Sequence, residues 1–462
     1  MSLVVDLNRR LETYAQQLCL AGDGFAHSFA TMLGVTRTWD SRLRAMAINT
    51  GTVVGLIADY SLDGISALLA LCNLGAIVAL IPRDRPVNSY LEDSNSEVLL
   101  QLYADGRYDH TRIRAKQAAH PLLQTLRATR QAVLIIFTSG SSGWPKAALH
   151  SLDRFLSKFH RPGRSFRTLA FMVFDHVAGL DTLFYTLSNG GALIVPARRD
   201  PQTVLETTAS QQVQVLPASP SFLRLLCVLD GDHQLDLSSL EVITYGSEPM
   251  DQPTLDRLNE RFPHAQVIQK YGTTEVGSPR TVSRGKDSLW LRIKDTEAKI
   301  VNGILWLRSE GTMLGYLNAP SPLDSYGWYC TGDLVEVEGE WMRFLGRADE
   351  TIKVGGEKVS PVEVERVIRE LDFIRDVVIS GEPHPLLGQI VRAHVQLKPG
   401  VVETNAIATQ IRTHCSRCLS SHHVPVRIEF SSEISTSIGY RQKSQRRNVS
   451  SETASINREP LG

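Results

Sequence analysis

The stretch "AVLIIFTSGSSGWPKAALHS" (residues 132–151) joins an apolar run to a segment of small and hydroxylic residues that contains one lysine. The run predicts a buried strand, because Val, Leu and Ile follow one another without polar alternation. Gly140 and Gly143 permit backbone conformations that point consecutive N–H groups at one anion, and Lys146 adds a positive charge. Two residues separate Gly143 from the lysine, so the stretch does not fit a Walker motif. Taken alone, it indicates either a phosphate-binding loop or a solvent-exposed turn.

Further apolar runs surround this stretch, and helix-like segments lie between several of them. Alternating strands and helices predict parallel sheets with helices on both faces. Ligands of such sheets bind beyond the carboxyl ends of the strands. The runs are TVVGLIA (52–58), AIVALI (76–81), TLAFMVF (168–174), ALIVP (192–196), VQVLP (213–217) and EVITYG (241–246).

The pattern changes from about residue 286, where apolar and polar residues alternate and "NG" and "EGE" mark hairpin turns. This predicts an antiparallel β subdomain. A compact α+β unit follows, and the end of the chain is polar without hydrophobic periodicity. We therefore predict an N-terminal core over residues 1–346, a C-terminal domain over 347–445 and a flexible tail over 446–462.

Composition restricts the class of protein. Of the 462 residues, 42% are hydrophobic and 21% charged, which is typical of soluble globular chains. Lys plus Arg and Asp plus Glu both total 49, so no basic field indicates nucleic acid as a partner. We find no signal peptide and no membrane span, and we expect a cytoplasmic protein. The motif CSRC (415–418), with its neighbouring histidines, leaves a zinc site as an alternative to a plain helix. The oligomeric state is not indicated.

More glycine-containing motifs follow later strand-like runs. They are YGSEPM (245–250), YGTTEVG (271–277), GWYCTGDL (327–334) and GRADETIKVGGEKVSPVEVE (346–365). A Tyr ring can stack on a base, a Thr hydroxyl can donate to a phosphate, and carboxylates can hold magnesium or ribose hydroxyls. Each motif taken singly also fits a structural turn.

In this order and spacing the motifs resemble the ANL superfamily of adenylate-forming enzymes, which includes acyl-CoA synthetases, nonribosomal adenylation domains and luciferases. The resemblance runs from about residue 50 to 445. It implies an α/β fold with a large N-terminal domain of two parallel-type sheets plus an antiparallel β subdomain, and a small mobile α+β C-terminal domain. It also implies a reaction with ATP and Mg2+, in which a small carboxylic acid becomes an acyl-AMP, pyrophosphate leaves, and a nucleophile displaces AMP.

The resemblance assigns a role to each matching residue. Lys146, Thr273 and Glu275 would be catalytic, Glu275 would bind Mg2+, and Asp349 would be the hinge of the C-terminal domain. The acid pocket would contain His176, Gly179, Pro217, Ser219 and Gly277. The nucleotide would be bound by Thr138, Ser139, Gly140, Ser141, Ser142, Gly143, Lys146, Gly246, Ser247, Glu248, Tyr271, Gly272, Thr273, Thr274, Asp333 and Arg347.

One position departs from the family pattern. In TSIGYRQK (436–443), Tyr440 stands where the family has a lysine that bridges the acid and the α-phosphate. A phenol is uncharged near neutral pH and does not replace that cation. Arg441 and Lys443 are the candidate catalytic cations nearby.

The acceptor of the acyl group divides the functional hypotheses. We favour an amide-forming ligase that passes a small hydrophobic or cyclic acid to an amino-acid amine. The alternatives are an acyl-CoA ligase and a non-catalytic nucleotide-binding homologue. Tyr440 supports the last, whereas the intact Lys146, Glu275, Asp333 and Arg347 argue against it.

Overall fold

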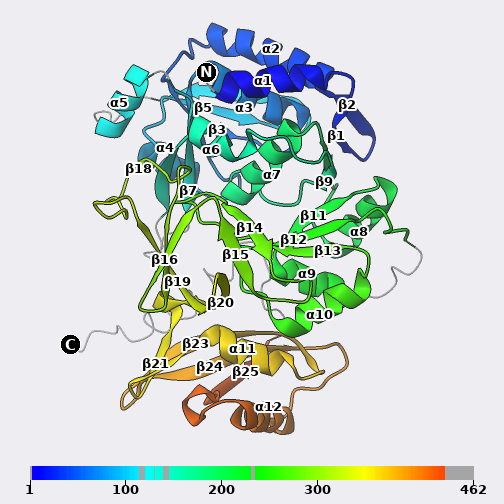
Figure 1. Cartoon of the computed structure of the whole chain (residues 1–462), viewed down its shortest axis with the longest axis vertical. Helices are drawn as coiled ribbons and strands as arrows, with labels where there is room; N and C mark the ends of the chain where they lie inside the picture. The colour runs from blue at the N-terminus through cyan, green and yellow to red at the C-terminus, as the bar shows by residue number, and fades with distance from the viewer. Residues whose placement is uncertain (1–2, 114–119, 130, 139–144, 230–234, 432–462) are drawn as a thin grey trace, which may run out of the picture.

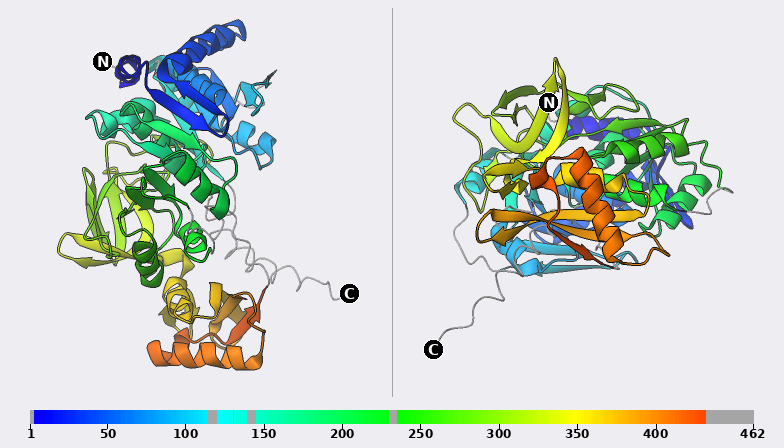
Figure 2. Two further views of the ribbon diagram at one scale, coloured as in Figure 1. Left: turned by 90° about the vertical axis from the view of Figure 1, so that its right-hand side faces the viewer. Right: turned by 90° about the horizontal axis from the view of Figure 1, so that it is seen from below.

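The computed structural model describes residues 3–113, 120–129, 131–138, 145–229 and 235–431. Two large sheets with their helices occupy the upper and right-hand parts of Figure 1, an antiparallel sheet lies to the left of β11–β13, and the C-terminal unit lies at the bottom. In the side view of Figure 2 the C-terminal unit stands apart from the sheets above it. The described part therefore consists of a large N-terminal and a small C-terminal domain.

Sheet I has the strand order β18-β8-β7-β4-β3-β5-β6. Its four central strands are parallel, and antiparallel strands flank them on both sides. The strands are β3 (Val53–Ile57), β4 (Ile77–Leu80), β5 (Val98–Leu102), β6 (Tyr108–Arg112), β7 (Val133–Thr138), β8 (Lys146–Ser151) and β18 (Gly315–Tyr316).

Sheet II has the order β13-β12-β11-β9-β10-β1-β2, and all neighbours except β1 and β2 are parallel. Its strands are β1 (Leu18–Gly22), β2 (Phe25–Ser28), β9 (Arg167–Leu169), β10 (Ala192–Val195), β11 (Val215–Ala218), β12 (Val242–Tyr245) and β13 (Gln266–Gln269).

One hydrophobic core fills the space between sheets I and II, where buried side chains of both sheets pack against the same helices. Two further cores cover their outer faces. The inner layer contains α1 (Leu3–Thr13), α2 (Phe29–Ala45), α3 (Leu62–Asn73), α6 (Leu152–Leu156), η1 (Ser157–Phe159) and α7 (Val177–Ser188). The outer helices are α4 (Val87–Asp93) and α5 (Pro121–Thr129) on sheet I, and α8 (Pro201–Ser210), α9 (Pro220–Cys227) and α10 (Gln252–Arg261) on sheet II.

Sheet III and the C-terminal unit complete the fold, and the strands of that unit form sheet IV, in the order β22-β21-β24-β23 with β25 beside β24. Sheet III is antiparallel and contains β14 (Arg280–Ser283), β15 (Leu291–Lys294), β16 (Glu297–Val301), β17 (Ile304–Arg308), β19 (Tyr329–Glu338) and β20 (Trp341–Arg347). After η2 (Ala348–Glu350), the C-terminal unit contains β21 (Ile352–Val354), β22 (Glu357–Val359), α11 (Pro361–Arg369), β23 (Ile374–His384), β24 (Gly388–Leu397), α12 (Asn405–Cys418), η3 (Ser421–His423) and β25 (Arg427–Phe430).

The predicted strands and the antiparallel subdomain are confirmed, with two differences. Sheets I and II are mixed and not purely parallel, because hairpins close their edges. The run TLAFMVF gives only the three-residue strand β9. The residues that follow it form irregular structure and turns that lead into α7.

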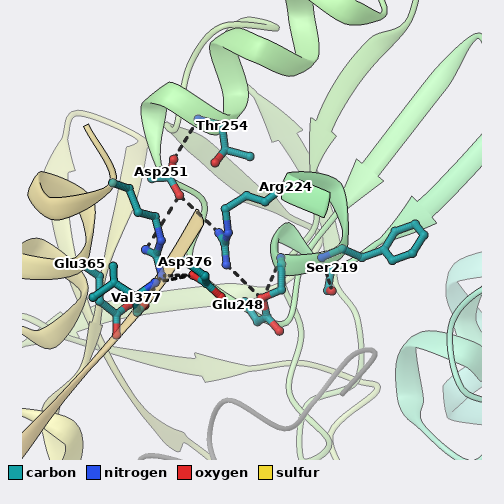
Figure 3. A network of polar contacts seen from close by, with 11 residues as sticks. Ser219, Arg224, Glu248, Asp251, Thr254, Glu365, Asp376 and Val377 are labelled. Carbon is teal, nitrogen blue, oxygen red and sulfur yellow. Dashed lines mark hydrogen bonds and ion pairs between the residues drawn. The ribbon is translucent and has the colours of Figure 1, made fainter. Parts of the chain in front are cut away.

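A network of charges joins the two domains (Figure 3). Asp251 caps α10 and forms an ion pair with Arg224 of α9 at 3.3 Å. It also lies 4.0 Å from Arg369 of α11. Arg369 also pairs at 3.4 Å with Glu365 and with Asp376 of its own domain. Burial opposes ionisation of Asp251, but Arg369 and Arg224 outweigh it and lower the pKa of this carboxyl. The network is therefore a candidate contact that fixes the observed domain orientation.

The remaining general predictions concern the membrane and the cysteines. Among the described residues no helix is both long and apolar enough to cross a bilayer. CSRC lies in α12, as its helical alternative predicted. Cys415 is buried, whereas Cys418 is exposed and lies near Glu370 and His414. The two thiols thus face different surroundings.

Candidate active site

A cavity of about 1720 Å³ lies where the carboxyl ends of strands in sheets I and II meet sheet III. Most of the described candidate residues line it, although they come from segments that lie as far apart in the sequence as Thr138 and Arg347. They are Thr138, Lys146, His176, Pro217, Gly246, Ser247, Glu248, Tyr271, Gly272, Thr273, Thr274, Glu275, Asp333 and Arg347. The motifs therefore converge on one site.

The opening stretch of sequence forms one wall of this cavity. Thr138 ends β7 and pairs directly with Lys146, which begins the antiparallel strand β8. The side chain of Asn318 holds the base of this hairpin, accepting from the Ala147 amide and donating to the Pro145 carbonyl at 2.8 Å each. A strand and not a helix follows the loop, which confirms that it is no Walker motif. The predicted ligands Ser139, Gly140, Ser141, Ser142 and Gly143 lie outside the described residues.

The predicted magnesium ligand lies in a tight turn. The backbones of Thr273 and Gly277 exchange two hydrogen bonds, and this closes the turn around Glu275. Glu275 is 9% exposed, and its Oε1 accepts a hydrogen bond of 2.6 Å from the Tyr316 hydroxyl. Lys146 Nζ lies 5.4 Å from the centre of the Tyr316 ring, so this tyrosine holds the carboxylate and the lysine side by side. Burial, followed by the charge of Glu275, raises the pKa of Tyr316, which keeps its phenol a donor.

A buried histidine supports the same turn. His150 of β8 is 1% exposed, and burial lowers its pKa to about 4. In the unfolded chain the pKa of this histidine is near 6.5. Between about pH 4 and pH 6.5 the unfolded chain therefore binds a proton that the folded protein does not bind. Stability is therefore complete above about pH 6.5 and falls as the pH drops toward 4.

We expect the substitution His150→Leu to remove this loss. The wild-type protein should lose roughly 3 kcal/mol of unfolding free energy between pH 7 and pH 4 through this group, and the variant should lose less by that amount. Denaturant titrations at pH 7, 6, 5 and 4 measure the difference. The exposed His264→Gln is the matched control. An unchanged pH dependence in His150→Leu would contradict this role.

Tyr271, Asp333 and Arg347 form the opposite wall. The Tyr271 hydroxyl donates to Asp333 Oδ2 at 2.6 Å, and Arg347 Nη1 lies 3.3 Å from Asp333 Oδ1. The Tyr271 ring stacks on Phe344, with centroids 4.5 Å apart and planes at 12°. A base can therefore use only the other face of this ring. Burial and then the charge of Asp333 raise the pKa of Tyr271.

The loop after β12 differs from its predicted role in two details. Gly246 was predicted to bind the nucleotide, and a Cβ there would lie 2.8 Å from the Lys270 carbonyl oxygen. The glycine is thus required by a backbone contact within the protein. The carboxylate of Glu248 accepts from the Ser221 amide at 3.0 Å and from its hydroxyl, which ties this loop to the start of α9. Ser247 has a φ of 73°, a left-handed conformation that is unusual for serine.

Three residues assigned to the acid pocket are not among those that line the described cavity. Ser219 caps α9 by accepting from the Phe222 amide. Gly179 lies in α7, where a Cβ would meet the Val173 carbonyl oxygen at 1.9 Å. Gly277, with a φ of 76°, closes the Glu275 turn. A small size or a hydroxyl at these positions serves backbone contacts, and their assignment to the acid pocket stays a prediction, whereas His176 and Pro217 line the cavity.

The link to the C-terminal domain begins at this wall. Arg347 Nε pairs with Asp349 at 2.9 Å, and Asp349 lies in η2 between sheet III and sheet IV. Burial opposes the effect, but Asp333 and Asp349 raise the pKa of Arg347. The candidate cations Arg441 and Lys443 lie outside the described residues.

Comparison with known families agrees with this arrangement. A family model described as AMP-binding enzyme matches residues 7–317, which is more than half of the chain. The chain belongs to the AMP-binding enzyme family. A second model, AMP-binding enzyme C-terminal domain, matches residues 363–437. The superfamily resemblance is thereby confirmed, and the nucleotide of this family is ATP, used with Mg2+.

Relatives of this AMP-binding enzyme include ligases with different acceptors. A Rhodococcus jostii protein named 3-[(3aS,4S,7aS)-7a-methyl-1,5-dioxo-octahydro-1H-inden-4-yl]propanoyl:CoA ligase is 27% identical over 323 residues, which cover 64% of this chain and 61% of that protein. The match thus spans about three fifths of that relative's length. The anthranilate CoA ligase AuaEII, solved with anthranoyl-AMP, superposes with a TM-score of 0.83 at 22% identity and 98% coverage of both chains. The amide bond synthetase McbA from Marinactinospora thermotolerans gives 0.78 at 21% identity, with coverage of 94% and 97%. The two structures show that the fold is shared.

The cavity suits a magnesium ion at Glu275. A carboxylate has about four lone-pair sites, so the hydrogen bond from Tyr316 leaves capacity for a metal. Oxygen donors beside bound phosphates are the usual ligands of Mg2+. When bound, the ion would neutralise charge on the phosphates.

Sequence reasoning missed several residues of this site. Tyr316, Asn318 and Phe344 belong to no quoted motif, and they reach the site from β18, the loop after it and β20. Lys270 also lines the cavity. Its signal was present, since a lysine at the end of a strand directly precedes the YGTTE motif.

Proposed function

We propose that this enzyme activates a small hydrophobic or cyclic carboxylic acid as an acyl-AMP and passes the acyl group to an amino-acid amine. The acid's carboxylate oxygen would attack the α-phosphorus of ATP, and the bond to pyrophosphate would break. The amine nitrogen would then attack the acyl carbon, AMP would leave with the electron pair, and the amine would lose a proton. The observation that carries the proposal is the convergence of Lys146, Thr273, Glu275, Asp333 and Arg347 on one cavity.

Residues of the site supply charge and position for the first step. Lys146 would attract the leaving phosphates, and Thr273 would donate to the α-phosphate. Asp333 and Arg347 would orient the ribose. Fixed charges and donors stabilise a transition state because they need no reorganisation during the reaction.

The second step needs a proton acceptor. Asp175 lines the cavity beside His176, and burial raises the pKa of its carboxyl. A carboxylate whose pKa is raised is a stronger base than an ordinary one. Asp175 is therefore a candidate for taking the proton of the acceptor.

The choice of an amine follows from likeness to one enzyme. FDHVAGLDTLF (174–184), YGSEPM (245–250) and KYGTTEVG (270–277) resemble coronafacate ligase, a phytotoxin-pathway enzyme said to join a bicyclic acid to an amino acid. The similarity to an amide bond synthetase is compatible with this acceptor. The names of the CoA-ligase relatives favour a second candidate, transfer to the thiol of CoA.

Two measurements test the proposal. Acid-dependent exchange of labelled pyrophosphate into ATP, over a panel of small cyclic acids, tests activation. Reactions with single amino acids or with CoA, analysed by mass, test the acceptor. We expect exchange with at least one acid and an amide product. Formation of acyl-CoA alone would replace the amide proposal by the thioester one. ATP binding without exchange for any acid would favour a non-catalytic homologue.

A further inference from the structure

The inner part of the cavity is a chamber between sheet II and α7. Strand residues alternate in direction, so every second residue of β11, β12 and β13 lines the cavity while those between pack into the outer core. The opposite wall comes from α7, where Ala178, Thr182 and Thr186 recur at the spacing of one helical face. The row at the amino ends of these strands, in register across four strands, holds Thr168, Val215, Val242 and Gln266.

Lys270 stands at the nucleotide side of this chamber. It follows β13 and lies four residues beyond Gln266, so it shares that residue's face about 13 Å farther along the strand. Much of the Lys270 side chain is accessible, and the cavity is the space that it lines. It directly precedes Tyr271 and Thr273, which places it between the predicted nucleotide site and the chamber.

The ammonium of Lys270 makes no hydrogen bond or ion pair within the described part of the chain. The carboxylate on the facing wall, Asp181, is already bound by Lys158, which also donates to the Ser278 carbonyl at 2.8 Å. Asp181 is therefore taken by Lys158. Within the described part of the chain, the ammonium of Lys270 is left without a counter-ion at this corner of the chamber.

Two hydroxyl groups deeper in the chamber lack partners as well. Thr168 and Thr186 are 4% and 2% exposed, and neither side-chain oxygen has a hydrogen bond among the described residues. Both residues line the cavity. Buried polar groups are usually satisfied, and leaving one without a partner costs about 1–3 kcal/mol. A purely apolar acid would leave all three groups unsatisfied.

We propose that the acid carries a second oxygen acceptor, a ketone or a carboxylate placed away from the activated carboxyl group, and that Lys270 binds it. This rests on the proposed function, and it adds a polar group to the hydrophobic or cyclic acid expected there. The Thr168 and Thr186 hydroxyls would provide donors for polar atoms at the far end of the molecule. Lys270 would then determine which acid is selected.

Three acids with one carbon skeleton test this selection. Cyclohexanecarboxylic acid, 4-oxocyclohexanecarboxylic acid and trans-cyclohexane-1,4-dicarboxylic acid differ only in the second group. We expect the wild-type enzyme to prefer the keto acid or the diacid by at least about tenfold in kcat/KM for pyrophosphate exchange, the range of a hydrogen bond to a charged group. Preference for the keto acid identifies a neutral carbonyl, and preference for the diacid identifies an anion.

The variant Lys270→Met keeps the length of the side chain and removes its charge. We expect the kcat/KM of this variant for the preferred acid to fall at least about tenfold. Its kcat/KM for the unsubstituted acid should equal that of the wild type. Lys294→Met, at an exposed lysine of β15, is the matched control. Equal use of the three acids by the wild type, or an equal loss for all of them in Lys270→Met, would overturn the proposal.

Calorimetric titration of the three acids into enzyme with AMP separates this inference from the proposed function. If no acid supports pyrophosphate exchange, the proposed function fails. Binding of the keto acid or diacid that Lys270→Met weakens would still support the role of Lys270. Binding that is the same in both proteins would overturn it.

Discussion

The substitution Glu275→Gln should lower acid-dependent pyrophosphate exchange at least about 100-fold. The amide has the size of the carboxylate, and its carbonyl oxygen still accepts the hydrogen bond that Tyr316 makes at 2.6 Å. Only the negative charge is lost, and with it the ligand for Mg2+. The loss should fall on the rate of acyl-AMP formation, since the turn is held by the backbones of Thr273 and Gly277.

The measurement is the exchange rate at saturating ATP over a series of Mg2+ concentrations. Glu206→Gln, at an exposed position on α8, is the control and should match the wild type. The thermal midpoint should be close to that of the wild type for both variants. Exchange within a few-fold of the wild type in Glu275→Gln would remove this residue from the metal site.

The substitution Arg369→Met should destabilise the protein by about 3–5 kcal/mol, the range seen when one partner of a buried ion pair is removed. Arg369 lies among Glu365, Asp376 and Asp251, with side chains 10% exposed or less. Methionine fills a similar volume but removes the positive charge that Glu365 and Asp376 pair with, and it leaves Asp251 with Arg224 alone (Figure 3). The unfolding free energy from denaturant titration measures the effect.

Arg366→Met is the matched control, because Arg366 is exposed on the same helix. The double variant Arg369→Met/Asp376→Asn should recover part of the loss, since it removes one of the buried carboxylates that Arg369 had paired. The pKa of Asp251 is lowered in the fold, so its contribution is present above the unfolded value near 3.9 and is lost as the pH falls. The difference between wild type and Arg369→Met should therefore shrink below about pH 4. A loss no larger than that of Arg366→Met would contradict the role of the network.

Local sequence was a good guide wherever short-range chemistry decides the structure. Val- and Ile-rich runs became the strands of sheets I and II, because extended, branched side chains pack on both faces of a parallel sheet. The order of the glycine-containing motifs predicted that Lys146, Glu275, Asp333 and Arg347 meet at the strand ends, and they line one cavity. The strands and the individual motifs depend mainly on residues that are close in the sequence.

Roles that depend on distant partners were predicted less well. Gly179, Ser219 and Gly277 look like pocket residues in the sequence, whereas their contacts with a carbonyl of the preceding loop, a helix amide and a turn are seen only in the fold. Tyr316 lies 41 residues from the Glu275 that it binds, and no periodicity links the two. Hydrogen bonds of this kind form only after separate elements have packed.

The sequence by itself determined the family of the chain, its strand and helix pattern, and the convergence of its motifs. Each motif and each apolar run consists of contiguous residues, so it can be recognised without the fold. The tertiary structure alone decided which groups remain without partners. The role proposed for Lys270 depends on the packing of α7 near sheet II and on the ion pair between Lys158 and Asp181. Arg369 likewise matters because α11 brings it to Asp251 of the other domain. Charge balance inside a protein is a property of packed neighbours, and their identity is fixed only by the complete fold.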